Sequence, residues 1–172
     1  MPSAQDQLDA VLIIFVLAVA FIDWRTHRIP NLLCAIAAMF GLSLQIAFHA
    51  EAGLLSALGG AAVGFAMFLP FYVLRAFGAG DVKAMAIVGI FLGMQATVLA
   101  VGSTLIAGAL LGALVLWLRP AHAGPALQRL IGLLLTPAAT VRDTRSRPHS
   151  SLRFPYGIAI AVGTVVALIV FR

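Results

Sequence analysis

The chain has 172 residues, of which 62% are hydrophobic and only 10% are charged. This composition is too apolar for an average soluble domain and indicates an integral membrane protein, with the lipid bilayer as its surroundings. The net charge of +5 does not indicate a nucleic-acid partner, because the basic residues lie in loops between apolar runs and form no basic face.

The apolar residues are grouped into long runs that are separated by short polar segments. At about 20 residues for each membrane-spanning helix, the length allows about six spans and leaves no room for a separate soluble domain. We therefore predict one membrane-embedded domain over residues 1–172. Its spans are predicted at residues 8–22, 31–48, 54–74, two within 84–118, and 158–171. The first run is expected to be retained as a span, because the residues before it lack the basic segment of a cleaved signal peptide.

The breaks between the later spans differ in character. Residues 49–53 are expected to form the loop between the second and third spans, and residues 93–95 the turn within 84–118. Residues 119–153 contain four prolines and six arginines, and we interpret them as a basic cytoplasmic loop. Within this loop, residues 126–136 are too short to span the bilayer and are predicted to form an interfacial helix. The sequence leaves open whether the loop contacts anionic lipid headgroups or a substrate.

The positive charges predict an orientation. Lys and Arg are enriched on the cytoplasmic side of membrane proteins. Six spans with an outer N-terminus place ten of the eleven basic residues on that side. The predicted fold is therefore an all-α, polytopic membrane protein with six transmembrane helices and with both the N-terminus and the C-terminus outside.

Two carboxylates fall together on the cytoplasmic side of this arrangement. Asp81 follows two glycines between two apolar runs, and Asp23 lies at the end of the first span. An ionisable residue at membrane depth is costly and is a candidate functional residue. The alternatives are that Asp81 only caps a helix and that Asp23 is a solvated residue paired with Arg25 or Arg28.

Paired carboxylates suggest acid–base chemistry. Two such groups held close together do not both ionise easily, so one keeps a proton while the other stays charged. The charged group can activate a water molecule, and the protonated group can polarise a peptide carbonyl. This chemistry needs no metal and no cofactor, and we predict neither. A serine–lysine dyad with Lys83, the only lysine, is disfavoured because the serines in the apolar runs lie in span interiors or nearer the other face.

Two other features are interpreted as packing. Cys34, the only cysteine, lies in an apolar run and is expected to be a small buried residue, which excludes an internal disulfide and a CxxC zinc site. Three GxxxG patterns allow helices to approach closely. We expect them to pack helices within the monomer, with a homodimer interface as the alternative. The patterns are Gly60 to Gly64, Gly89 to Gly93 and Gly108 to Gly112.

Three stretches together resemble the signatures of the type IV prepilin peptidases, and in particular the short members of tight-adherence (Flp) pilus systems. They are Asp23-Trp24-Arg25-Thr26-His27-Arg28-Ile29-Pro30-Asn31, Gly78-Ala79-Gly80-Asp81-Val82-Lys83, and Pro155-Tyr156-Gly157 followed by Ile158-Ala159. The resemblance implies that Asp23 and Asp81 are the catalytic residues of a GxGD membrane aspartic protease. It implies substrate-binding or supporting roles for Gly78, Gly80, Lys83, Arg25, Asn31, Pro155, Tyr156 and Gly157.

The resemblance also implies a substrate and a location. The expected partner is a prepilin or pilin-like precursor, whose leader would be removed at the cytoplasmic face of the bacterial inner membrane. Longer members of the family also N-methylate the product and often carry paired CxxC motifs. With one cysteine and a short first inner loop, this chain is expected to have no N-methyltransferase domain. The alternatives are a proton-coupled membrane transporter, which would use acids as a relay, and a non-catalytic pilus assembly factor.

Overall fold

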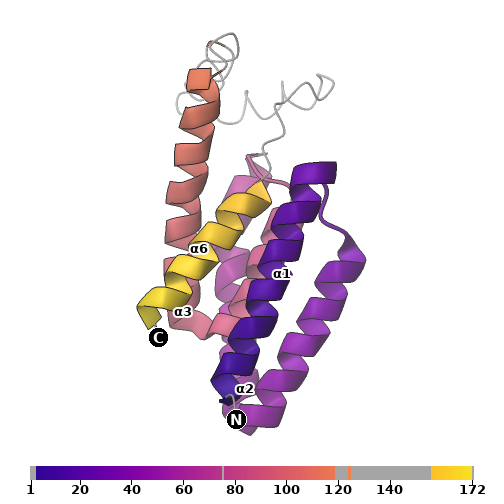
Figure 1. The fold of residues 1–172 in the computed structure, drawn as a ribbon. Coiled ribbons are helices and arrows are strands. Elements are labelled where there is room, and N and C mark those ends of the chain that lie inside the picture. Colours follow the sequence, from indigo (N-terminus) through magenta and orange to yellow (C-terminus); the bar gives the residue numbers. More distant parts are fainter. Residues whose placement is uncertain (1–2, 75, 119–123, 125–155, 172) are drawn as a thin grey trace.

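The computed structural model of the chain describes residues 3–74, 76–118, 124 and 156–171. In these residues the secondary structure is entirely helical, which confirms the predicted all-α class. The helices are α1 (Ala4–Thr26), α2 (Asn31–Val73), α3 (Ala79–Leu118) and α6 (Tyr156–Phe171) (Figure 1). Pro155 lies outside the described residues, as do the predicted basic loop at 119–153, apart from residue 124, and its interfacial helix at 126–136.

Three of these helices, α1, α2 and α3, are long and apolar enough to cross a membrane. The fourth, α6, is apolar but has only 16 residues. The described part of the chain therefore contains three candidate membrane spans, and the six predicted spans are not confirmed as separate helices. The difference arises because α2 and α3 each join two predicted spans into one helical element.

Both long helices contain a sharp break. The backbone leaves helical geometry at Ala50 in α2, where φ is 51°, and at Gly93 in α3, where φ is 73°. An unbroken helix of 43 residues would be about 65 Å long, about twice the thickness of a bilayer core. Figure 1 shows each helix doubling back at the end of the bundle where α1 begins. The predicted turns at residues 49–53 and 93–95 are confirmed.

Glycines bring α2 and α3 into backbone contact. A Cβ atom at Gly60 would clash with the Gly89 carbonyl, and a Cβ atom at Gly89 would clash with the Gly60 carbonyl. One turn away, Gly64 lies against the Met85 carbonyl oxygen. Small residues permit this approach where lipid supplies no hydrophobic drive between helices. The expected packing of these GxxxG glycines within the monomer is confirmed, whereas Gly112 has no neighbouring atom within 4 Å of a Cβ placed there.

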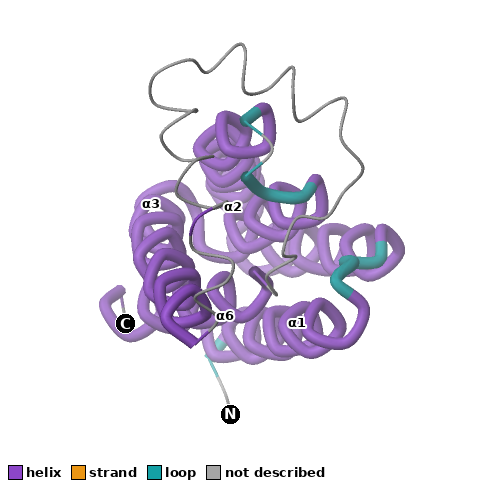
Figure 2. The backbone as a smooth tube through the Cα atoms, turned by 90° about the horizontal axis from the view of Figure 1, so that it is seen from above, coloured by secondary structure: helices purple, strands orange, loops and turns teal. Residues whose placement is uncertain are grey.

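Helix α6 lies between α1 and α3 (Figure 2). Gly163 of α6 packs against Thr104 of α3, and Gly157 packs against Val19 and Asp23 of α1. The buried face of α1 is a stripe of residues spaced by three or four positions, as expected for a helix that packs along one side. Its buried members are Leu8, Leu12, Phe15, Val16, Val19 and Asp23.

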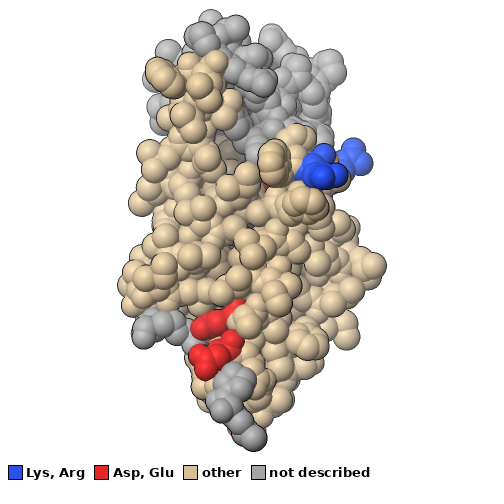
Figure 3. Space-filling view, viewed as in Figure 1, with Lys and Arg blue, Asp and Glu red and all other residues tan. Residues whose placement is uncertain are grey.

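Charged side chains separate towards the two ends of the bundle (Figure 3). Asp6 lies in the first turn of α1 and Arg25 in its last turn. Between these ends the surface carries many large exposed apolar side chains, among them Ile14, Leu17 and Phe21 of α1. An apolar belt between two charged ends suits a protein that is surrounded by lipid.

Candidate functional site

Asp23 is a buried carboxylate at the end of the apolar stripe of α1. Only 5% of its surface is exposed. Its Oδ2 atom accepts a hydrogen bond of 2.8 Å from the backbone N–H of Gly157. Gly157 lies in the first turn of α6, where backbone N–H groups have no partner within the helix and carry a partial positive charge. The start of α6 therefore supplies the polar contact that this buried acid needs.

Asp81 is held in a similar way at the start of α3. It is 9% exposed, and its Oδ2 accepts a hydrogen bond of 2.9 Å from the N–H of Gly78, three residues earlier. Such a bond is one half of a capping box, in which an acid in the first turn closes back on the residue before the helix. The cap that the sequence offered as an alternative is therefore present. It uses one carboxylate oxygen and leaves the second one available for another role.

The structure brings the two acids together from helices α1 and α3. Their carboxylates lie close enough for their charges to interact. In the part of the chain that is described, only the Oδ2 atom of each acid accepts a hydrogen bond. No ion pair joins Asp23 to Arg25 or Arg28 there, and the Arg25 guanidinium instead lies 5.2 Å from the centroid of the Phe21 ring. The alternative of a solvated Asp23 paired with a neighbouring arginine does not agree with this geometry.

Three of the other predicted site residues interact with one of the two acids. Gly78 and Gly157 contact the carboxylates directly through their amides. Tyr156 interacts electrostatically with Asp81, and its hydroxyl donates a hydrogen bond of 3.4 Å to the Thr104 carbonyl. Each residue here comes from the start of α6 or from the segment before α3, so these two segments form the walls of the site.

The remaining predicted residues surround the pair without contacting it. Gly80 packs against the side chain of Ile29, in the segment that joins α1 to α2. The Nζ atom of Lys83 donates a hydrogen bond of 2.9 Å to Oδ1 of Asn31, which links the starts of α3 and α2. A groove of about 370 Å³ lies beside this bond and is lined mainly by apolar residues of the same two helices. Cys34 lines the groove and is buried, as expected.

Sequence reasoning missed two parts of this site. It gave Gly157 only a general supporting role, although its amide is the group that holds Asp23. It also gave no role to Phe77, whose ring packs on that of Tyr156. A signal was present in both cases, because an aromatic residue immediately precedes each of the two glycines that hold an acid.

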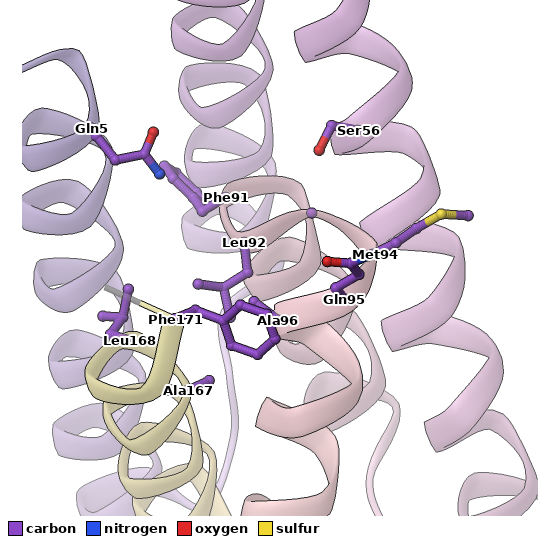
Figure 4. Close-up of a pocket in the computed structure, with 11 residues that line it drawn as sticks. Gln5, Ser56, Phe91, Leu92, Met94, Gln95, Ala96, Ala167, Leu168 and Phe171 are labelled. Carbon is purple, nitrogen blue, oxygen red and sulfur yellow. The ribbon is translucent and has the colours of Figure 1, made fainter.

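A larger cavity, of about 410 Å³, lies at the other end of the bundle (Figure 4). Figure 4 shows Ser56 and Gln95 near the break in α3, with Phe171 of α6 on the opposite side. Neither Asp23 nor Asp81 lines this cavity. The candidate site is therefore located by the paired acids and not by this cavity.

The fold and the site define an all-helical membrane protein that buries two interacting carboxylates at one end of its bundle. The comparison with known families agrees with this class. Residues 10–119 match the type IV leader peptidase family, and the chain belongs to that family and is a peptidase. The match contains Asp23 and Asp81 but stops before Gly157, so the contact between α6 and Asp23 is known from the structure alone. Comparison with the curated proteins gave no match, and neither did comparison with the solved structures.

Proposed function

We propose that this protein is an aspartic endopeptidase that removes the leader peptides of type IV or Flp prepilins, with Asp23 and Asp81 as its catalytic pair. One observation carries the proposal. Two buried carboxylates from different helices interact with each other, and each uses only one oxygen to accept a hydrogen bond from the described residues. Paired acids that are desolvated and close together are typical of catalytic sites.

The reaction needs one acid to be charged and the other protonated. The charged carboxylate takes a proton from water as the water oxygen attacks the scissile carbonyl carbon. The protonated carboxyl donates a hydrogen bond to the carbonyl oxygen and stabilises the negative charge that develops there. The tetrahedral intermediate then collapses, the C–N bond breaks, and a proton passes to the leaving amine. The Gly78 and Gly157 amides hold the two acids in place through these steps.

We place the site at the cytoplasmic face of the bacterial inner membrane. The breaks at Ala50 and Gly93 divide α2 and α3, so that with α1 and α6 the described chain has six helical segments, in line with six spans. The acids lie at the end of α1 that carries Arg25, and α1 begins and α6 ends at the opposite end. Under the positive-inside rule, this arrangement supports cytoplasmic acids and outer termini.

The test is co-expression with a tagged pilin precursor from the same source. Asp23→Asn and Asp81→Asn are each expected to reduce leader removal at least about 100-fold at matched membrane levels, because either change removes one partner of the acid–base pair. Glu51→Gln, an exposed acid beside the Ala50 break, is the matched control and should process normally. Normal processing by either aspartate variant would refute the aspartic mechanism.

A further inference from the structure

The two acids are held by two segments with the same local design. Phe77 immediately precedes Gly78, whose amide binds Asp81, and Tyr156 immediately precedes Gly157, whose amide binds Asp23. The rings of Phe77 and Tyr156 are in contact, with centroids 4.2 Å apart and planes at 37°. The two amide donors are therefore joined, one residue back in each segment, by a pair of aromatic rings.

The pair is anchored on the end of α2. Phe68 is fully buried, and its ring centroid lies 5.1 Å from that of Phe77 and 6.3 Å from that of Tyr156. Phe71 stacks on Phe77 with centroids 5.0 Å apart. Aromatic contacts of this kind stabilise a geometry beyond simple apolar burial. Helix α2 thus holds the two rings in place, and the backbone amides of the residues that follow them bind the acids.

Helix α3 fixes the other side of Tyr156. A Cβ atom at Gly108 would lie 2.5 Å from both Cε2 and the hydroxyl oxygen of Tyr156, so a larger residue there would force the tyrosine side chain to shift. Further along α6, the Gly163 carbonyl accepts a hydrogen bond of 3.0 Å from Ser103 of α3. Gly163 is six residues beyond Gly157, which is about 9 Å along a helix. Close to the carboxylates, the contact between the Phe77 and Tyr156 rings links the start of α6 to the segment before α3.

We propose that the contact between Phe77 and Tyr156 is a positioning clamp that sets the separation of Asp23 and Asp81. Because each ring is one residue from an acid-binding amide, a change in the ring contact moves one amide relative to the other, and each amide carries its carboxylate with it. Phe77 and Tyr156 are positioning residues and need not touch the substrate. The proposal rests on the proposed peptidase function for its effect on rate, but its effect on geometry is independent of that function.

The first measurement is the rate of leader removal by purified protein in detergent or nanodiscs. Phe77→Leu and Tyr156→Leu are expected to lower kcat about 10- to 100-fold, because a displacement of about 1 Å in an active site can cost this much. KM should change little, since no group that binds substrate is removed. Tyr156→Phe keeps the ring and should retain near-normal kcat. Phe15→Leu removes a more deeply buried ring from the core of α1 and should also retain it.

The second measurement reports the geometry without any activity. In a Cys34→Ala background, Trp24→Cys and Ala79→Cys place spin labels on exposed positions beside the two acids. Pulsed electron paramagnetic resonance then gives the distribution of distances between the labels. Phe77→Leu and Tyr156→Leu are expected to shift or broaden this distribution, while Tyr156→Phe and Phe15→Leu leave it unchanged.

The outcomes separate the two proposals. An unchanged distribution in both clamp variants would overturn the clamp, and so would a loss of kcat in Tyr156→Phe equal to that in Tyr156→Leu, because the hydroxyl would then be the active group. A shifted distribution in a protein whose wild type cleaves no pilin precursor would support the clamp and refute the proposed substrate. A shifted distribution with reduced kcat would support both.

Discussion

The two ends of the bundle bury polar groups in opposite ways. At one end, Asp23 and Asp81 each accept one hydrogen bond from a backbone amide through a single carboxylate oxygen. At the other end, the Nε2 atom of Gln45 donates to the carbonyls of Ile90 and Phe91, at 3.0 and 3.2 Å. Those carbonyls belong to the turn before the break at Gly93, where a helix loses its own donors. We call these the carboxylate end and the glutamine end.

The carboxylate end is therefore suited to reactivity, whereas the glutamine end contributes to stability. At the glutamine end one side chain satisfies backbone groups that the break exposes, and a satisfied buried polar group stabilises the fold. At the carboxylate end two ionisable groups share a small space, which is unfavourable for folding and suited to acid–base chemistry. We therefore expect substitutions at the carboxylate end to lower the rate of leader removal. Substitutions at the glutamine end should lower the free energy of unfolding.

Apart from the aspartate and ring variants, the largest effect is expected from Gly157→Ala. The added Cβ atom would lie 2.9 Å from Cβ of Asp23 and 3.1 Å from the Val19 carbonyl oxygen, so the start of α6 must move away from α1. Leader removal is expected to fall at least about tenfold, because the amide that holds Asp23 moves with the helix. Initial rates with a tagged precursor, normalised to folded protein, measure the change.

Gly112→Ala is the control for that prediction. A Cβ atom at Gly112 would have no neighbour within 4 Å, and alanine favours a helix over glycine. The control should process the precursor within about twofold of wild type. Equal rates for Gly157→Ala and Gly112→Ala would mean that the position of α6 does not control Asp23.

A smaller effect is expected at the glutamine end from Gln45→Leu. The change keeps the side-chain volume but leaves the Ile90 and Phe91 carbonyls without their donor, so the free energy of unfolding should fall by about 1 kcal/mol. Unfolding in mixed detergents measures this loss. The rate per folded molecule should stay within about twofold of wild type, since the acids lie at the other end.

Gln95→Leu is the control, because Gln95 is exposed and makes no hydrogen bond within the described part of the chain. Equal stability of the two variants would refute the role of Gln45.

The same two ends show what the sequence could predict. Hydrophobic run length and glycine placement were enough to locate the breaks at residues 49–53 and 93–95, because a bilayer limits the length of a helix. The positive-inside rule placed Asp23 and Asp81 on one side, and the structure brings them together at one end of the bundle. These features depend on local composition and on the membrane, and both can be read from one sequence.

Tertiary contacts could not be predicted in this way. Every residue except proline has a backbone N–H, so even the aromatic residue before Gly157 does not indicate that the Gly157 amide donates to an acid 134 positions earlier. The hydrogen bonds of Gln45 to the carbonyls near Gly93 could not be predicted either, because an isolated polar residue in an apolar run has many potential partners. The break at Ala50 has a positive φ without a glycine, which propensity alone does not indicate.

The smallest expected effect concerns the bond between Lys83 and Asn31, which lies beside the carboxylate end without contacting either acid. Both residues are exposed, so water competes with the bond, and a double-mutant cycle of Lys83→Met and Asn31→Leu should give a coupling of about 0.5 kcal/mol or less in the free energy of unfolding. Either variant alone should change leader removal by no more than about threefold. A loss from Lys83→Met comparable to that from Asp81→Asn, with the fold intact, would extend the site from the paired acids to the groove between α2 and α3. The lysine ammonium would then belong to the substrate-binding surface, and the carboxylate end would act through more than its two acids.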